Sequence, residues 1–408
     1  MIKELNLVNW KSFENAKLFI DPLTFLIGTN ASGKSNVLDA FNFLYRIASG
    51  KQIQTAISGD SEIKPIRGGI DWFLKKNSQS ESSTIEIILE TDSKGFDYKY
   101  SIEIRKVDEK SCELASESLS LIVRSPVYRD RQLFYTANTE PGAPGIHTYF
   151  YTAKRGKQRK ITLNRAYSII GQVDKLNVLK EIKDAATTVV SFLQNIFILD
   201  PISNHMRDYT KLSDTLAPDA SNIAGVLAAL PDERRKEIEM ALSTYTKPLP
   251  EKDINKVWVE KVGRFASDAM LYCEEKWSEN ESVEVDARGM SDGTLRFLAI
   301  VTALLLGKEN SLLIIEEIDN GLHPSRAKLL VEVLKELSEK RKIDIVCTTH
   351  NPAFINALGN SMIPFISYVS RDKANGNSKI SLLEDLDNLP KLMASDSLGN
   401  LMIKNAFK

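Results

Sequence analysis

The sequence predicts an α/β fold in which a mixed or parallel core sheet is accompanied by an antiparallel β subdomain and a helical lid insertion. Three observations predict it: apolar strands alternate with helices at both ends of the chain, polar and apolar residues alternate over 82–106, and helical periodicity dominates over 201–278. The expected domains are 1–200, 201–290 and 291–408, the first and last of which form the two parts of the core.

Composition excludes several classes of protein. A chain of 408 residues with 43% hydrophobic content can bury a large core, and its formal net charge of -1 shows no overall basic excess. Three cysteines without a CxxC pair argue against a disulfide framework or a structural zinc site and favour a reducing cytoplasm. We expect no membrane anchor, because the apolar runs are much shorter than a membrane span.

The segment Gly28-Thr-Asn-Ala-Ser-Gly-Lys-Ser35 lies between an apolar strand pattern and an amphipathic helix pattern. Gly28 and Gly33 allow the backbone N–H groups to turn inward as an anion nest, and the helix adds the positive end of its dipole. Lys34 is expected to reach the β and γ phosphates of a nucleotide, and the Ser35 hydroxyl to ligate Mg²⁺. A chance turn before a helix is the alternative. The predicted ATP-binding residues are Gly28, Asn30, Ala31, Ser32, Gly33, Lys34, Ser35 and Asn36.

Two acids follow a second apolar strand pattern, Leu312-Leu-Ile-Ile, and burying them unpaired would cost several kcal/mol. Glu316 is the candidate Mg²⁺ ligand, and Glu317 is the candidate base that orients the attacking water. His350 follows the strand pattern of Ile343–Cys347, at the sheet edge where ligands bind in such folds, and is predicted to contact the γ-phosphate.

A second anion-binding helix end is predicted around residue 291. Ser291 can cap the following helix and Gly293 frees backbone amides at its N-terminus, although an ordinary capped helix is the alternative. One nucleotide site does not need two such helix ends on one chain. We therefore expect a second copy of the chain to use the spare one.

The order of these motifs resembles the ABC-type ATPases of the RecF, SMC and OLD group over nearly the whole chain. The strongest likeness is to the stand-alone "AAA family ATPase" of bacterial anti-phage systems, which are PARIS-like, Septu-like or RloA-like. The resemblance implies an ABC ATPase head that closes head to tail as a nucleotide sandwich dimer. The trans signature would be Ser291, Asp292, Gly293 and Thr294, the dimer loop Asp319 and Asn320, and the ligands ATP and Mg²⁺.

Three features depart from the family pattern. Glu316 stands where the family usually has Asp, and no glutamine is evident in the Mg²⁺-contacting loop. No long coiled coil occurs, which excludes a full-length SMC-type protein. The residues after His350 leave no room for the Toprim nuclease domain of OLD nucleases, so an effector is expected to be a separate protein.

Two main functions are compatible with this pattern. The first is an ATP-hydrolysing switch that forms a homodimer or higher homo-oligomer around ATP and controls a nuclease or toxin encoded nearby. The second is a RecF-like DNA-binding ATPase in DNA repair, which the near-zero net charge disfavours. A pseudo-ATPase scaffold is a third class. The DNA-contacting residues in the second reading are Lys154, Arg155, Lys157, Arg159 and Lys160.

Overall fold

The computed structural model describes residues 1–76, 78–91, 95–124, 130–153, 157–249, 254–278 and 281–407. It divides into two compact units, each built from several chain segments. Unit 1 consists of Met1–Asp21, Gly28–Ile196 and Ser367–Leu382, and unit 2 consists of Pro22–Ile27, Phe197–Ile366 and Leu383–Lys408. The glycine-bearing loop therefore belongs to unit 1, whereas the acidic strand end belongs to unit 2. The predicted α/β class is confirmed.

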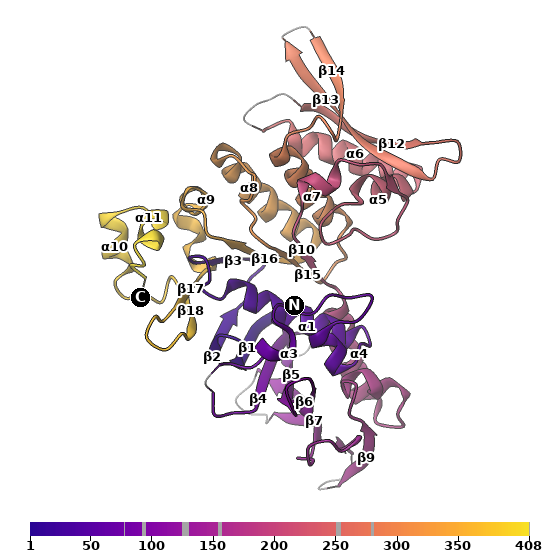
Figure 1. Cartoon of the computed structure of the whole chain (residues 1–408), viewed down its shortest axis with the longest axis vertical. Helices are drawn as coiled ribbons and strands as arrows, with labels where there is room; N and C mark the ends of the chain where they lie inside the picture. The colour runs from indigo at the N-terminus through magenta and orange to yellow at the C-terminus, as the bar shows by residue number, and fades with distance from the viewer. Residues whose placement is uncertain are drawn as a thin grey trace. The chain divides into compact units, whose positions relative to one another are not determined.

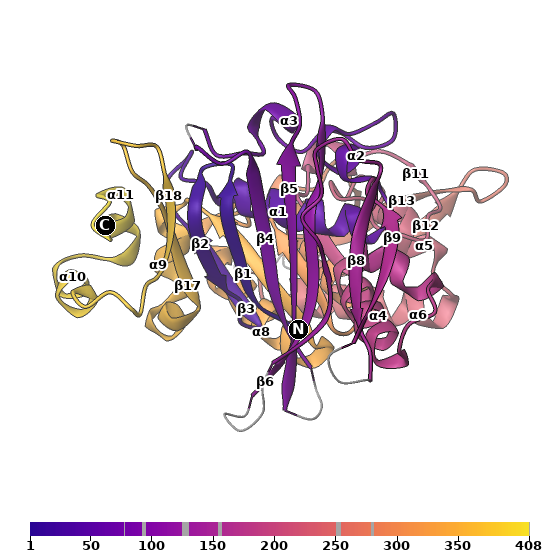
Figure 2. The same ribbon diagram turned by 90° about the horizontal axis from the view of Figure 1, so that it is seen from below.

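The sheet of unit 1 is mostly antiparallel, and Figure 2 shows β2, β1, β4 and β5 side by side with α1 behind them. Every second residue of β4 is buried, as expected for a sheet with one covered face. The predicted hairpin over 82–106 is confirmed as β4 and β5. The strand order is β17 (Ile366–Arg371), β18 (Ser378–Leu382), β2 (Phe13–Phe19), β1 (Ile2–Trp10), β4 (Ser82–Glu90), β5 (Phe96–Lys106), β6 (Cys112–Val123), β7 (Arg131–Thr136), β8 (Gly145–Tyr151) and β9 (Gln158–Asn164).

Short helices accompany this sheet. They are α1 (Lys34–Ala48), α2 (Ile53–Ser58), α3 (Gly69–Trp72), η1 (Ile170–Lys175) and α4 (Lys180–Gln194). The apolar face of α1 packs against α4, and the Gln194 side chain donates to the carbonyl of Ala48. The sequence pattern predicts that this last helix starts near Lys175. It starts at Lys180 instead, because the chain is extended at Leu176 and Leu179.

A buried carboxylate fixes one loop of unit 1 to the sheet. Glu117 of β6 accepts hydrogen bonds from the Tyr100 and Ser168 hydroxyls and from the backbone N–H groups of Ile169 and Ile170. Its burial raises its pKa to about 7 despite these four donors. The side chain therefore anchors the start of η1 to the middle of the sheet.

Unit 2 contains a parallel core of the predicted βαβ type. The strands are β10 (Ile196–Leu199), β15 (Ser311–Ile315), β16 (Ile343–Thr349) and β3 (Leu23–Ile27), in that order, and all residues of the last three are buried. Strand β15 pairs parallel with β16, and the connection between them contains α8 (Pro324–Arg341). The remaining helices are α7 (Asp292–Leu306), α9 (Pro352–Leu358), η3 (Asn360–Phe365), α10 (Leu389–Ser395) and α11 (Leu398–Ile403).

The prediction of a helical lid over 201–290 is only partly right. Helices α5 (Ile223–Ala229) and α6 (Asp232–Thr246) are present, with a short η2 (Ser203–Met206) before them. The second half instead forms an antiparallel sheet that packs against α5 and α6 (Figure 1). Its strands are β12 (Ile254–Val262), β13 (Asp268–Ser278) and β14 (Glu281–Asp286), and the short β11 (Thr210–Lys211), which precedes α5, pairs with β13.

The alternation of buried and exposed residues explains why strands rather than helices form within residues 254–286. Val257 and Val259 of β12 are buried while the residues between and beside them are more exposed, which is a period of two. Helix α6 also covers the outer edge of β12: Ser243 Oγ accepts from the N–H of Val257 at 2.9 Å, and Glu239 Oε1 from the N–H of Val259 at 3.0 Å. These bonds satisfy an edge strand that would otherwise be open to pairing.

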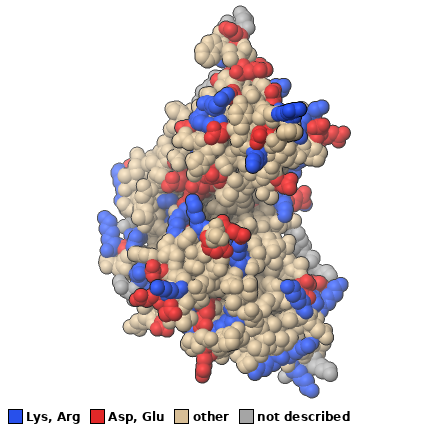
Figure 3. All heavy atoms as spheres, turned by 45° about the vertical axis from the view of Figure 1, so that its right-hand side comes forward, with Lys and Arg blue, Asp and Glu red and all other residues tan. Residues whose placement is uncertain are grey.

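The surface carries charges of both signs. On the face drawn in Figure 3, Lys and Arg side chains are interspersed with Asp and Glu, in keeping with the net charge of -1. Among the helices of the described ranges, none combines the length and apolar character needed to cross a membrane.

The raised pKa of Glu117 predicts a pH-dependent stability. Because its folded pKa of about 7 exceeds the ordinary 4.5, the folded state keeps a proton that the unfolded state releases. This contribution is complete below pH 4.5 and is lost as the pH rises through 7. Between pH 6 and 8 the unfolding free energy of the wild type should fall by about 1 kcal/mol more than that of Glu117→Gln, measured by urea denaturation. Equal changes in both proteins would contradict the assignment.

Candidate functional site

The loop between β3 and α1 has a backbone conformation that requires glycine at two positions. Gly28 has φ +156° and Gly33 has φ +120°. A Cβ atom on Gly28 would lie 2.3 Å from the Val369 carbonyl oxygen, and one on Gly33 would lie 2.7 Å from Ser378 Oγ. Both distances are below van der Waals contact. A side chain at position 28 would require backbone to move, whereas one at position 33 would displace the Ser378 side chain and would also have to adopt a backbone conformation that favours glycine.

Hydroxyl groups from distant parts of unit 1 hold this loop in place. The Ser378 hydroxyl donates to the Ser32 carbonyl at 2.5 Å and lies 2.7 Å from the Ser12 hydroxyl. Asn36 Nδ2 also donates to Ser12 Oγ, at 2.7 Å. The start of α1, the turn between β1 and β2 and the β17–β18 hairpin are thereby joined at the loop. Sequence reasoning missed Ser12 and Ser378, which carry no local motif.

Lys34 opens α1 and extends back over the loop. Its ammonium donates to the carbonyl of Gly28 at 2.7 Å and to that of Thr29 at 3.0 Å. No side chain of the described residues caps the N-terminus of α1. The positive end of the helix dipole and the Lys34 charge therefore point to the same concave backbone, the arrangement that binds phosphate in glycine loops.

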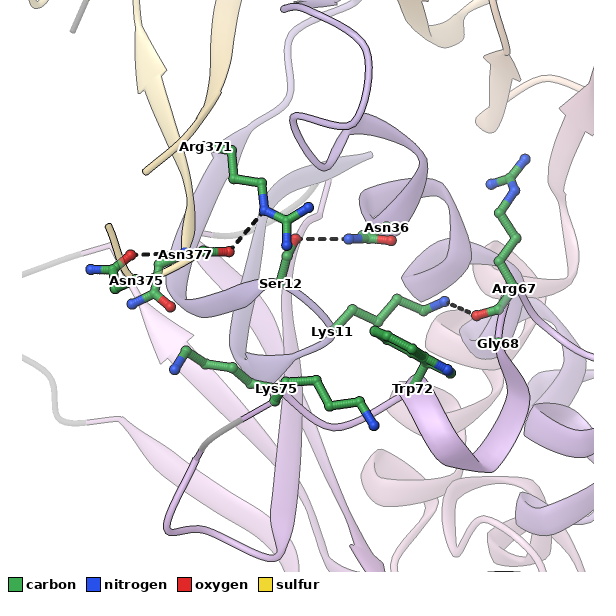
Figure 4. Close-up of a pocket in the computed structure, with 12 residues that line it drawn as sticks. Lys11, Ser12, Asn36, Arg67, Gly68, Trp72, Lys75, Arg371, Asn375 and Asn377 are labelled. Atoms are coloured by element: carbon green, nitrogen blue, oxygen red, sulfur yellow. Dashed lines mark hydrogen bonds between the residues drawn. The ribbon is translucent and has the colours of Figure 1, made fainter. Parts of the chain in front are cut away.

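A pocket of about 490 Å³ opens beside the loop, within unit 1 (Figure 4). Ser12 and Asn36, which belong to the hydroxyl network, line one side of it. Lys11 also lines it, and forms a buried ion pair with Asp39 at 2.6 Å. Burial lowers the pKa of Lys11, although the Asp39 charge opposes this effect.

In unit 2, the predicted acids stand at the carboxyl end of β15. The Glu316 N–H donates to the Leu199 carbonyl at 2.9 Å, and the Glu317 N–H donates to Thr348 Oγ1 at 2.8 Å. Glu317 has φ +46°, a left-handed conformation that costs a non-glycine residue about 1 kcal/mol or more and that clusters at functional sites. His350 Nδ1 lies 3.6 Å from Glu317 Oε1. The structure thus places Glu317 and His350 close to each other.

A further carboxylate stands beside Glu316. Asp200 follows β10, and the bond from Glu316 to the Leu199 carbonyl places these two strand ends next to each other. The sequence analysis missed Asp200, although Ile196-Phe-Ile-Leu-Asp200 has the same pattern of an apolar strand followed by an acid. Among the described residues there is no group of three or more His, Cys, Asp or Glu side chains that could hold a metal ion.

The segment before α7 has the predicted cap. Ser291 Oγ accepts from the Thr294 N–H at 3.1 Å, which starts the helix. Asp292 pairs with Arg207 at 2.6 Å, and this hydrogen bond lowers the pKa of the Asp292 carboxyl. The Arg207 guanidinium also donates to the Met290 carbonyl, and a Cβ on Gly293 would lie 2.8 Å from the Gly321 carbonyl oxygen. The segment Ser291–Thr294 therefore forms a capped turn that packs on the loop carrying Asp319 and Asn320.

Arg296 connects this helix to the catalytic candidate. Its guanidinium donates to the Glu317 carbonyl at 3.2 Å and to the Pro201 carbonyl. Burial lowers the pKa of Arg296, and the nearby charges of Asp200 and Asp319 oppose that effect. Asp319 is itself buried, and its Oδ1 has no hydrogen-bond partner in the described part of the chain, whereas Asn320 is exposed. The sequence analysis had no signal for Arg296.

Several of the remaining predicted residues that the structure describes are exposed. Asn30 and Ala31 are exposed at the tip of the phosphate loop, and Ala31 adopts φ +61°. Of the basic cluster, Lys154 and Arg155 lie outside the described residues. The other three members, Lys157, Arg159 and Lys160, are exposed at and before β9.

Comparison with known proteins places the fold. One similar structure is the crystal structure of the SmcHead bound to the C-winged helix domain of ScpA. The SmcHead is 15% identical to this chain, and the alignment covers 93% of this chain and 97% of the SmcHead chain with a TM-score of 0.53. The SMC head domain from Thermotoga maritima is 14% identical, and the alignment covers 93% of this chain and 98% of that domain with a TM-score of 0.47. A third similar structure is the Smc head domain with an extended coiled coil bound to the C-terminal domain of ScpA derived from Pyrococcus furiosus. It is 14% identical, and the alignment covers 96% of this chain and 99% of that chain with a TM-score of 0.48. The first similarity shows that the fold is that of an SMC head.

No curated protein matches the sequence. A family model described as "AAA domain, putative AbiEii toxin, Type IV TA system" matches residues 23–158 and 201–356, which include the glycine loop, the acidic strand end and His350. Because the match spans more than two thirds of the sequence, the chain belongs to this AAA-domain family.

Proposed function

We propose that the protein is a Mg²⁺-dependent ATPase of the ABC type whose ATP state controls its assembly and, through it, a separate effector protein. The loop between β3 and α1 carries the proposal: Gly28 and Gly33 adopt conformations and make contacts that only glycine permits, directly before an uncapped helix. Together with Lys34 this is the chemistry of a triphosphate cradle.

The residues of the loop have distinct roles in this proposal. Backbone N–H groups from Gly28 to Asn36 hold the phosphates, and Lys34 exchanges its bonds to the Gly28 and Thr29 carbonyls for phosphate oxygens. The exchange leaves the ammonium close to its present position, so little reorganisation is needed. The Ser32 carbonyl remains bound to Ser378, which keeps the loop open toward its ligand.

The donor set fits Mg²⁺. Ser35 and Glu316 are the proposed protein ligands, and both supply hard oxygen atoms of the type that Mg²⁺ prefers. Mg²⁺ commonly takes only one or two carboxylates and completes its shell with water and phosphate. When bound, the ion would neutralise charge on the phosphate oxygens. Asp200, beside Glu316, is the candidate for the position where the sequence lacks a glutamine.

Glu317 is the proposed catalytic base. Its backbone is held from both sides, by the Thr348 hydroxyl at its N–H and by Arg296 at its carbonyl, so the carboxylate is presented in a defined direction. His350 is close enough to the Glu317 carboxylate to sense its position and is proposed to contact the γ-phosphate. A fixed carboxylate that orients water is the main contribution a protein side chain makes to this reaction.

A second copy of the chain completes the site in this proposal. The segment Ser291–Thr294 forms the N-terminal end of α7, which is proposed to bind an anion, and Arg207 holds this end in place. Asp319 and Asn320 lie on the loop against which the segment packs. We assign this segment to the γ-phosphate of a partner's ATP, and Asp319 and Asn320 to the contact between copies. The assembly would be a homodimer or a larger homo-oligomer.

The substitution Glu317→Gln tests the catalytic assignment. It should lower steady-state ATP hydrolysis by about 100-fold, because it removes the base while the phosphate cradle is intact. ATP binding should persist, and light scattering should show an ATP-dependent dimer that does not dissociate. Glu332→Gln, at an exposed position of α8, is the matched control and should behave like the wild type. Unchanged hydrolysis in Glu317→Gln would refute the assignment.

Control of a separate protein is supported by the fold. One similar structure is an SMC head bound to the C-winged helix domain of ScpA. The proposal therefore places the biological output, such as a nuclease or toxin of an anti-phage system in a bacterial cytoplasm, in another polypeptide.

DNA binding is the competing function, and exposed Lys157, Arg159 and Lys160 favour it. The two functions predict different outcomes. Co-expression with the neighbouring gene should give a stable complex under an ATP-trapping condition if the protein is a switch. If it is a RecF-like ATPase, the purified chain should bind duplex DNA with a strong salt dependence, and replacing the three basic residues by Gln should abolish that binding. Salt-dependent duplex binding without a protein partner would contradict the switch.

A further inference from the structure

We infer that the pocket beside the phosphate loop binds a phosphate ester that ATP does not have: the phosphate on the ribose of a 3′-phosphorylated nucleotide, or the equivalent phosphodiester of a nucleic-acid strand. The pocket has a volume of about 490 Å³, within the range of small-molecule sites. The inference rests on the proposed function only in taking the loop as the site of the triphosphate.

The charges around the pocket are all of one sign. Five cationic side chains line it and no carboxylate does. Two of them, Lys11 and Arg67, lie 2.6 Å and 3.4 Å from the Asp39 carboxylate, so that acid offsets part of their charge. The other three, Lys75, Lys76 and Arg371, have no ion-pair partner within the ranges that the structure describes. Unpaired cations that converge on one pocket favour an anionic ligand.

Arg371 is held in place for such a ligand. Its Nε donates to the Gly376 carbonyl at 3.1 Å, which fixes the side chain across the β17–β18 turn. Figure 4 shows its guanidinium extending toward Ser12. This hairpin also carries Ser378, which closes the phosphate loop. A ligand that contacts both Arg371 and the loop would therefore bind to the β17–β18 hairpin and to the loop that this hairpin holds in place.

Trp72 adds a surface for a nucleobase. Its side chain is 56% exposed, although it is among the largest apolar groups of the chain. The Lys76 ammonium lies 4.3 Å from the centre of the indole ring, and the ring borders the pocket in Figure 4. An exposed aromatic ring with neighbouring cations is the combination with which proteins bind bases and phosphates of single strands.

The number of cationic side chains that line the pocket favours a ligand with more negative charge than ATP. The loop amides, the helix dipole, Lys34 and Mg²⁺ already balance the triphosphate in the proposed function. The nucleoside that would extend past Asn36 into the pocket is neutral, so it gives Lys75, Lys76 and Arg371 nothing to neutralise. A phosphate on the ribose supplies the missing negative charge at that end.

Calorimetric titration of the full chain with three probes tests this inference: ATP, adenosine 3′-phosphate 5′-triphosphate, and a 12-nucleotide deoxyadenosine strand without a triphosphate. The 3′-phosphorylated nucleotide should bind about tenfold more tightly than ATP, the gain expected for one additional charge-assisted contact. The double variant Lys75→Ala with Lys76→Ala should lose that gain and retain the wild-type affinity for ATP. Lys110→Ala with Arg264→Ala, at exposed positions elsewhere, should retain both.

The probes separate the possible outcomes. Salt-dependent binding of the strand that is lost in the pocket variant would identify a nucleic acid as the source of the phosphate, whereas a gain only for the 3′-phosphorylated nucleotide would identify a small ligand. Quenching of fluorescence that disappears in Trp72→Phe would place the base on the indole ring. Equal affinities for ATP and its 3′-phosphate with no strand binding would overturn the inference. Absence of ATP binding alone would refute the proposed function while the other two probes still decide on the pocket.

Discussion

The arrangement of the phosphate loop depends on one interaction, the approach of the Ser378 hydroxyl to the Ser32 carbonyl and to Gly33. That hydroxyl belongs to a hairpin near the end of the chain, yet it fixes a turn near the beginning. Glycine is favoured at position 33 by its φ of +120°, and the Ser378 hydroxyl also lies 2.7 Å from where a Cβ would stand. With the turn fixed, α1 starts without a side-chain cap and Lys34 points back over the loop. The geometry of the proposed phosphate-binding loop is therefore a product of long-range packing as well as of the local motif.

In unit 2 a buried cation has the organising role. Arg296 of α7 donates to the carbonyls of Glu317 and Pro201, and so joins the signature helix to the ends of β15 and β10. The left-handed backbone of Glu317 is stable because the Thr348 hydroxyl and Arg296 hold it on both sides. In the proposed composite site, the signature acts on a partner's ATP while Glu317 acts on the chain's own. One helix would then transmit the state of one site to the other.

Much of this could be predicted from the sequence, for physical reasons. The parallel core is built from strands that are apolar throughout, and glycine spacing identified the loop because few residues tolerate its backbone. The sheet over 254–286 was missed, because its strands carry charged residues on the exposed face and follow two clearly helical segments. Ser12, Ser378 and Arg296 could not be predicted, since their partners are far away in sequence and only the tertiary fold brings them together.

The central claim is that two chains build each ATP site, and mixing two inactive variants tests it most directly. Lys34→Ala removes the lysine that is proposed to bind phosphate, and Ser291→Arg blocks the proposed signature; each variant alone should hydrolyse almost no ATP. In a 1:1 mixture half of the dimers contain one of each, and one of their two sites is intact, so the account predicts about a quarter of wild-type activity. Activity in either variant alone, or none in the mixture although the chains associate, would contradict the composite site.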